Sequence, residues 1–137
     1  MDAARLKRYK EKMELISKRT GEIDEWESEF LEDEKTQLAC YKAFQESTEA
    51  AMDILAMLAK DSGSIPKDDY SNIDFAVEKR IVTKKTGESL KEANGLRNRF
   101  VHHYNGLVTR QAYESLLKLL PVFEQFIEEV EKWLQKV

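Results

Sequence analysis

The sequence predicts an all-α protein: one domain over residues 1–137, built as an up-and-down bundle of about four main helices and one short helix. Two observations indicate this fold class. Only five glycines and two prolines interrupt the 137 residues, whereas a multi-stranded β fold needs a turn about every 8–12 residues. Apolar residues also recur at intervals of three and four along most of the chain, and no segment alternates convincingly as a strand does.

Composition narrows the class of protein. Hydrophobic residues make up 42% and charged residues 35%, which is typical of a globular domain with a charged exterior. The net charge of −4 argues against capture of nucleic acid by the surface as a whole, but it does not exclude a local basic site. Residues 1–12 are charged throughout, and no apolar run approaches the ~20 residues that span a bilayer. We therefore expect a cytoplasmic protein without a membrane segment.

The first half of the chain predicts two helices. A first amphipathic helix presents an apolar face and is expected to end at Gly21, a typical C-terminal glycine. Residues 22–33 are acidic and are expected to form a connector of one or two turns. Residues 34–60 contain neither glycine nor proline and predict a helix about 40 Å long at 1.5 Å per residue, with Leu38 in its apolar stripe. Cys40 lies in this helix without an acid–base partner, so we expect it to be inert.

Residues that interrupt helices divide the second half of the chain into separate helical segments. Residues 61–66 end the long helix, and a short helix is expected to begin among residues 69–72. A second stop is expected at 84–87, where Lys-Lys-Thr-Gly precedes a new helical pattern. Ser89 and Glu92 have the spacing of a capping box and are expected to open that helix.

The last helix also has local boundary signals. Asn105-Gly106 is expected to close the preceding helix, and Thr109 is the expected N-cap of the next one. This last helix is expected to reach the C-terminus and to bend at Pro121, which cannot donate a backbone hydrogen bond.

Residues 95–105 concentrate the polar side chains that could carry chemistry. Both histidines, His102 and His103, lie there with Arg97, Arg99 and Tyr104. Adjacent histidines point about 100° apart on a helix, and no carboxylate, cysteine or imidazole lies four residues from His102, so the segment is a poor metal site. There is also no glycine-rich phosphate loop and no nucleophile elbow. A chemistry without metal or cofactor, using arginine, histidine and tyrosine, is what remains.

A helical wheel separates the arginine from the histidine. With Arg97 at zero, Val101 and Tyr104 fall within about 40°, whereas Asn98 and His102 fall at roughly 100° and 140°. Asn98 lies one turn before His102 and is placed to orient its imidazole. Arg97 and His102 diverge too far to form one small site on a straight helix. Either the helix unwinds at its end, or two copies meet across a two-fold axis to form a composite cleft.

Such a cleft suits cleavage of RNA by the RNA's own 2′-hydroxyl. A histidine that titrates near neutral pH can move the proton, and a permanently protonated guanidinium can grip the scissile phosphate. From residue chemistry alone, an ordinary solvated helix edge is the more frequent explanation of these side chains.

Residues 97–104 fit the pattern Arg-x4-His-x-Tyr, and the chain resembles the HepT-like proteins of the HEPN superfamily over nearly its whole length. The position of the motif late in the penultimate long helix and the proline in the last helix add to the resemblance. The resemblance implies a HEPN-like fold and a metal-independent ribonuclease toxin of a prokaryotic toxin–antitoxin pair that acts as a homodimer. It also implies a minimal nucleotidyltransferase (MNT) antitoxin as the partner.

The resemblance also implies roles for individual residues. Arg97 and His102 would be catalytic, Asn98 would orient the site, and Tyr104 would be AMPylated by the antitoxin. His103 occupies a variable position of the motif.

Arg99 and His103 are candidates for RNA contact. Two rival functions stay open: a non-catalytic helical HEPN subunit that serves a nucleotidyltransferase, and a helical dimer without an active site.

Overall fold

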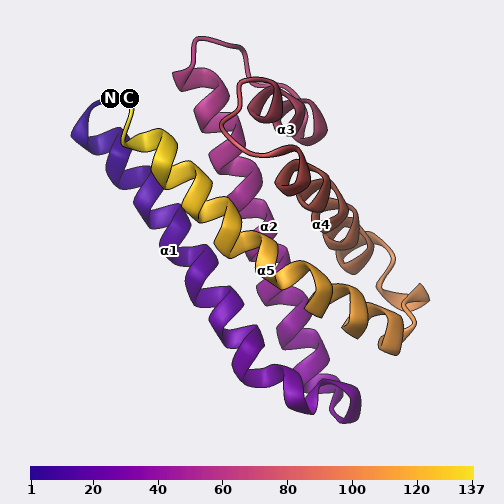
Figure 1. The fold of residues 1–137 in the computed structure, drawn as a ribbon. Helices are drawn as coiled ribbons and strands as arrows, with labels where there is room; N and C mark the ends of the chain where they lie inside the picture. The colour runs from indigo at the N-terminus through magenta and orange to yellow at the C-terminus, as the bar shows by residue number, and fades with distance from the viewer.

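The computed structural model describes all residues from 1 to 137 and confirms the all-α bundle (Figure 1). Its helices are α1 (Ala3–Trp26), α2 (Glu34–Asp61), the short α3 (Asp69–Glu78), α4 (Lys84–His102) and α5 (Thr109–Leu134). Two 3₁₀ segments, η1 (Glu27–Glu32) and η2 (Tyr104–Gly106), precede α2 and α5. None of the helices combines the length and the apolar character that a membrane span requires.

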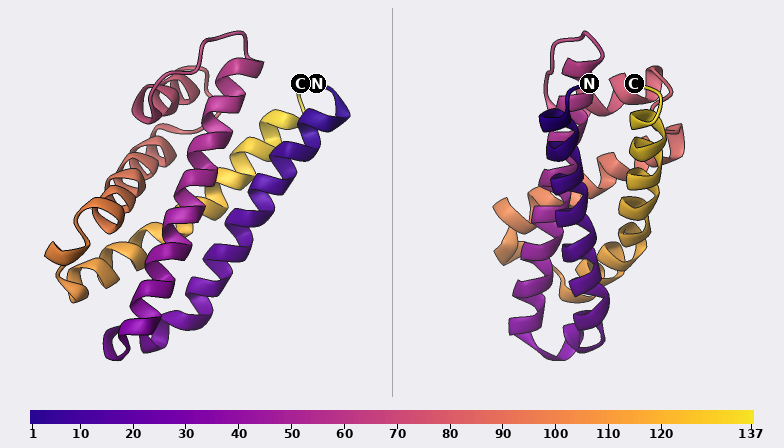
Figure 2. Two further views of the ribbon diagram at one scale, coloured as in Figure 1. Left: turned by 180° about the vertical axis from the view of Figure 1, so that it is seen from behind. Right: turned by 90° about the vertical axis from the view of Figure 1, so that its left-hand side faces the viewer.

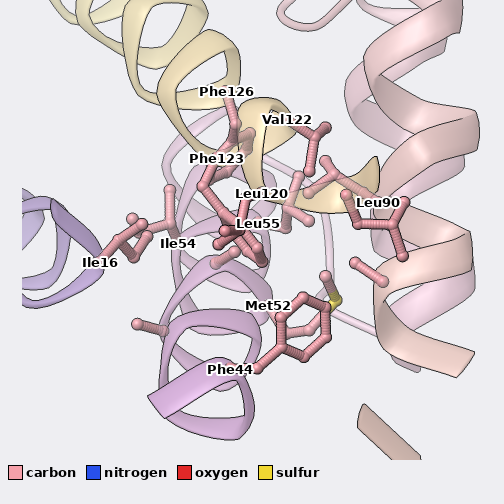
Figure 3. Close-up of a cluster of buried hydrophobic side chains, with 14 of the residues drawn as sticks. Ile16, Phe44, Met52, Ile54, Leu55, Leu90, Leu120, Val122, Phe123 and Phe126 are labelled. Carbon is pink, nitrogen blue, oxygen red and sulfur yellow. The ribbon is translucent and has the colours of Figure 1, made fainter. Parts of the chain in front are cut away.

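Helix α2 is the centre of the bundle, because it contacts each of the other four helices (Figures 1 and 2). The core is one continuous apolar cluster to which α1, α2, α4 and α5 all contribute. Phe44 of α2, Leu90 of α4 and Phe123 of α5 are fully buried in it (Figure 3). The rings of Phe44 and Phe123 meet edge to face with their centres 5.6 Å apart. Pro121 lies inside α5, and Figure 2 shows that α5 follows a curved path around α2.

Helix α1 continues through Gly21, so the expected end at this residue is wrong. Ile23 lies beyond it and is fully buried. Burying an isoleucine contributes about 1.5–3 kcal/mol, which outweighs the roughly 1 kcal/mol that a glycine costs inside a helix. The connector expected over residues 22–33 is therefore shorter and consists of η1 alone, with Asp33 as the N-cap of α2.

The expected stop at 84–87 and the capping box at Ser89 are also wrong, because the N-cap of α4 is Thr83. The hydroxyl of Thr83 accepts a hydrogen bond from the amide of Thr86 at 3.1 Å. Glu129 of α5 accepts one from the amide of Thr83 and one from the hydroxyl of Thr86, both at 2.6 Å. The start of α4 is thus fixed by a carboxylate from another helix, which no local pattern indicates.

Three smaller differences concern the ends and faces of helices. Helix α4 ends at His102, before the Asn105-Gly106 pair that was expected to close it. The N-cap of α5 is Val108, so Thr109 is the first helical residue and not the cap. Leu38 is 46% exposed and does not belong to the core.

The long helix expected over residues 34–60 is confirmed as α2. Cys40 within it is fully buried. Burial and, after it, the charge of Glu27 raise the pKa of the Cys40 thiol to about 11. A thiol that is protonated and enclosed is unreactive, as expected from the sequence.

Two glycines inside helices give a matched pair of stability predictions. A β-carbon at Gly87 would lie 2.5 Å from the Cγ2 atom of Val77, and this β-branched side chain has little rotamer freedom. We expect Gly87→Ala to lower the free energy of unfolding by about 1–3 kcal/mol. Gly21 has nothing within 4 Å of such an atom, so Gly21→Ala should raise it by about 1 kcal/mol through helix propensity. Urea unfolding measures both variants; a Gly87→Ala protein as stable as Gly21→Ala would contradict the close packing of α3 on α4.

Candidate functional site

The segment from Arg97 to Tyr104 covers the C-terminal end of α4 and the start of η2, at the end of α4 remote from its connection to α3 (Figure 1). Phe100 anchors this end to the core. Its ring centre lies 4.4 Å from that of Tyr41 and 5.6 Å from that of Phe44, both on α2. With Phe100 buried against α2, the polar residues around it are distributed over the remaining faces of the helix.

Arg97 is largely buried and is held by residues of three helices. Its side chain is 17% exposed; Nη1 lies 3.6 Å from the carboxylate of Glu49 on α2, and Nη2 lies 3.5 Å from that of Asp69 on α3. Nη2 also donates a hydrogen bond to the Oδ1 atom of the buried Asn94 at 3.2 Å. The Nε atom is buried and has no hydrogen-bond partner. These contacts, at distances of 3.2–3.6 Å, hold the guanidinium against α2 and α3 and leave the buried Nε without an acceptor.

Glu49 and Asp69 are site residues that sequence reasoning missed. They come from α2 and α3, far from the motif in the chain, and acidic residues are common all along this sequence. Only the packing of α4 on α2 and α3 singles them out.

His102 is the last residue of α4, and its side chain is exposed. Asn98 is half-buried one turn earlier, but no hydrogen bond joins its amide to His102 in the single chain. His103 leaves the helical conformation with φ −130° and ψ 31°, and its backbone amide donates to the carbonyl of Arg99 at 2.9 Å. The imidazole of His102 is therefore open to a substrate or to a second chain.

Tyr104 lies outside α4, so its expected place on the helical wheel beside Arg97 is wrong. The reason is the conformation of His103, which ends the helix and starts η2. The ring of Tyr104 packs edge to face on Tyr41 with centres 6.0 Å apart, and the residue is 38% exposed. Burial and, after it, the neighbouring Tyr104 raise the pKa of Tyr41. The contact holds the Tyr104 ring while leaving part of the residue accessible.

Arg99 faces a different part of the surface from Arg97. It is exposed and lines a hollow of about 250 Å³ between α4 and α5, together with Lys118. The two arginines of the motif region are thus separated: Arg97 faces α2 and α3, and Arg99 faces α5.

Exposed apolar side chains lie within the motif and just after it in the chain. Val101 is 41% exposed and Val108 is 57% exposed, and Tyr104 lies between them in the chain. Apolar side chains grouped on the surface are typical of an interface.

A single chain therefore offers a guanidinium for an anion and an imidazole for proton transfer, but in different environments. Arg97 is packed against α2 and α3, whereas His102 is exposed at the helix end. No group of three or more histidine, cysteine or carboxylate side chains is close enough to hold a metal ion.

Comparisons with known proteins agree on one family. The model of the family described as HepT-like ribonuclease matches residues 9–130. A protein of Archaeoglobus fulgidus named a candidate RNase is 38% identical over 136 residues, which cover 97% of this chain and 98% of the relative. A second protein of the same organism and name is 35% identical over 120 residues, covering 88% and 89%.

Solved structures agree on the fold. A tri-AMPylated HEPN toxin from Shewanella oneidensis, solved in complex with an MNT antitoxin, matches with a TM-score of 0.85. The match covers 96% of this chain and 99% of the toxin, at 24% sequence identity. The helical arrangement of this chain is therefore the HEPN fold.

Proposed function

The chain belongs to the HepT-like ribonuclease family, and from this we propose that it is a metal-independent endoribonuclease, the toxin of a prokaryotic toxin–antitoxin pair. In this proposal two copies form a homodimer, and Arg97 of one subunit works with His102 of the other. The observation that carries the proposal is that Arg97 packs against α2 and α3 whereas His102 is exposed at the end of α4, with Val101 and Val108 exposed in the same part of the chain. A second copy packed on this surface supplies the missing half of each site.

The proposed reaction uses only groups of the protein and the RNA. The imidazole of His102 removes the proton of a 2′-hydroxyl, and the resulting oxyanion attacks the adjacent phosphorus. The guanidinium of Arg97 stabilises the charge that develops on the phosphate oxygens. The bond to the 5′-oxygen of the next nucleotide breaks, and that oxygen takes a proton from an imidazolium or from water. The products are a 2′,3′-cyclic phosphate and a 5′-hydroxyl.

Incubation of the purified protein with RNA tests this reaction. We expect cleavage that persists at full rate in excess EDTA, with cyclic phosphate and 5′-hydroxyl ends identified by mass spectrometry of the fragments. Cleavage that stops in EDTA and returns with a divalent cation would contradict the proposed chemistry. The appearance of 5′-phosphate ends would contradict attack by the 2′-hydroxyl.

A second candidate function is a non-catalytic HEPN subunit of a nucleotidyltransferase. The ion pairs of Arg97 with Glu49 and Asp69 favour it, because these two carboxylates compete with a scissile phosphate for the guanidinium. A protein that cleaves no RNA but still binds and stimulates an MNT partner would support this function over the first.

We further propose that an MNT antitoxin inactivates the protein by AMPylation of Tyr104. The partial exposure of Tyr104 and its place two residues after His102 support this site. An AMP group there adds a bulky anion at the mouth of the cleft. It would compete with the RNA phosphate for Arg97.

The modification is measured by mass spectrometry after co-expression with an MNT partner. We expect about 329 Da per AMP added, the mass that follows from the chemistry of the adduct, and none in Tyr104→Phe. Tyr70→Phe is the matched control, because Tyr70 is 41% exposed and lies outside the motif. Loss of the adduct in Tyr70→Phe, or its retention in Tyr104→Phe, would count against Tyr104.

A further inference from the structure

A hollow of about 840 Å³ lies at the end of α4 opposite the Arg97–Tyr104 segment. Its walls come from the end of α3, the connection from α3 to α4, the first turn of α4 and the C-terminal part of α5. In Figure 1 the α3–α4 connection runs beside the yellow end of α5. We call it the basic hollow after its five cationic lining residues, Lys79, Arg80, Lys84, Lys132 and Lys136.

The lining of the basic hollow carries five cationic residues and one carboxylate, so positive charge is in excess. None of its five cations takes part in an ion pair, although nine ion pairs form elsewhere in the chain. The only carboxylate in the lining is Glu129, which is buried, and its oxygens already accept hydrogen bonds from Thr83 and Thr86. Five unpaired cations around one concavity, in a chain of net charge −4, indicate a site for a polyanion.

The backbone of Arg80 adds an independent observation. Arg80 has φ 59° and is the only residue other than glycine with a positive φ. This position follows the end of α3, where glycine is the usual residue because a β-carbon strains the left-handed conformation. Arginine at this position places a positive charge at the rim of the hollow, whereas glycine would place none.

The start of α4 also belongs to the basic hollow, because Lys84 lines it. The backbone amide of Lys84 lies in the first turn, where a helix provides no acceptor for it. The positive end of the α4 dipole therefore lies at the basic hollow, where the carboxylate of Glu129 is also held.

We propose that the basic hollow binds the phosphate backbone of the RNA substrate at a distance from the cleavage site. The identity of the ligand rests on the proposed ribonuclease function. Helix α4 has 19 residues and is about 28 Å long at 1.5 Å per residue, with the hollow at one end and His102 at the other. An RNA strand stacked at about 3.4 Å per nucleotide covers this distance with roughly eight nucleotides. Lysine and arginine contacts to phosphate carry no sequence information, so this site selects for length and not for sequence.

A binding experiment tests the hollow independently of cleavage. The protein carries His102→Ala to prevent turnover, and fluorescence anisotropy follows a labelled single-stranded RNA of about 20 nucleotides between about 50 and 200 mM salt. The test variant adds Arg80→Gly and Lys132→Ala. The glycine relieves the strained backbone, so this substitution does not threaten folding. The matched control adds Lys18→Ala and Lys35→Ala, which remove the same charge from exposed lysines outside the hollow that form no ion pair.

The expected result follows from counterion release. Each lost phosphate contact reduces the salt slope of log K by about 0.7 for a single strand, so the test variant should lose about 1.4. The dissociation constant should then rise about 25-fold at 0.1 M salt, because each contact contributes a factor of about five there. The control variant should bind as its parent does.

Kinetics with His102 intact provide a second readout. Arg80→Gly with Lys132→Ala should raise KM for the long RNA without changing kcat. A substrate of about four nucleotides, too short to span α4, should be cleaved equally by both proteins. This length dependence distinguishes a remote binding site from a general loss of structure.

Each remaining outcome decides one of the two proposals. Absence of RNA binding by the His102→Ala parent, or an unchanged dissociation constant and salt slope in the test variant, would overturn the basic hollow as an RNA site. Loss of MNT binding with unchanged RNA binding would also overturn it and would assign the hollow to an acidic protein surface. RNA binding that depends on the hollow, in a protein that cleaves no RNA, would support the hollow and reject the ribonuclease function.

Discussion

Replacing His102 by alanine is expected to lower the rate of RNA cleavage by a factor of about 10² to 10⁴, the contribution of a positioned general acid or base. The side chain is exposed at the last residue of α4, so its removal leaves the core intact. The loss should therefore appear in kcat, while the urea unfolding curve stays unchanged. In bacteria, we expect expression of the wild-type protein to slow growth and the same substitution to relieve this effect.

His103→Ala is the matched control for this prediction. His103 is also exposed and lies directly beside His102, but it occupies the variable position of the motif. We expect kcat within a few-fold of wild type, with any effect confined to the affinity for RNA. Equal losses in the two variants, or none in either, would remove His102 from the catalytic role.

A heterodimer of two inactive chains is expected to recover about half of the wild-type activity, because one of its two composite sites is complete. One chain carries Arg97→Gln and the other His102→Ala. The intact site combines Arg97 of the His102→Ala chain with His102 of the Arg97→Gln chain. Glutamine is chosen because it keeps a donor for Glu49 and Asp69, whose carboxylates would otherwise lose their partner.

The heterodimer is isolated with two different affinity tags, so that only mixed dimers are assayed. The matched controls are the two homodimers purified with the same tags, which should both be inactive. An inactive heterodimer would show that Arg97 and His102 work within one chain. In that case α4 must unwind near its end to bring them together, which is the alternative that the helical wheel allows.

Local patterns in the sequence predicted most of the fold. The stretch without glycine or proline over residues 34–60 predicted α2 almost to the residue. The breakers at 61–66 were also found correctly, since α2 ends at Asp61. These features depend on side chains three or four residues apart, or on the conformational limits of single glycines and prolines, and are therefore visible in one chain segment.

The errors at Gly21 and at 84–87 have a common cause. Each glycine was interpreted as the end of a helix, because glycine is the usual residue at helix C-termini. The buried Ile23 carries α1 past Gly21, and in α4 the close approach of Val77 explains why Gly87 lies inside a helix. Both explanations require the positions of neighbouring helices.

The candidate site could also be predicted only in part from the sequence. The identities of Arg97, His102 and Tyr104 and their spacing were readable from the sequence, because the motif is contiguous in the chain. The sequence also indicated that Arg97 and His102 diverge on one helix. It could not indicate that Glu49 and Asp69 hold Arg97, since these contacts join α4 to α2 and α3.

By itself, the sequence determined the all-α class, most of the extent of the long helices and the spacing of Arg97, His102 and Tyr104, since helical periodicity and a contiguous motif are local. The tertiary structure alone decided where α4 begins, which carboxylates meet Arg97 and where the basic hollow lies. Glu129 caps α4 from 46 residues away, and the basic hollow joins residues 79–84 to residues 132–136. The physical reason is that hydrogen bonds and charges act over a few ångströms in space, and packing brings together groups that the chain order keeps far apart.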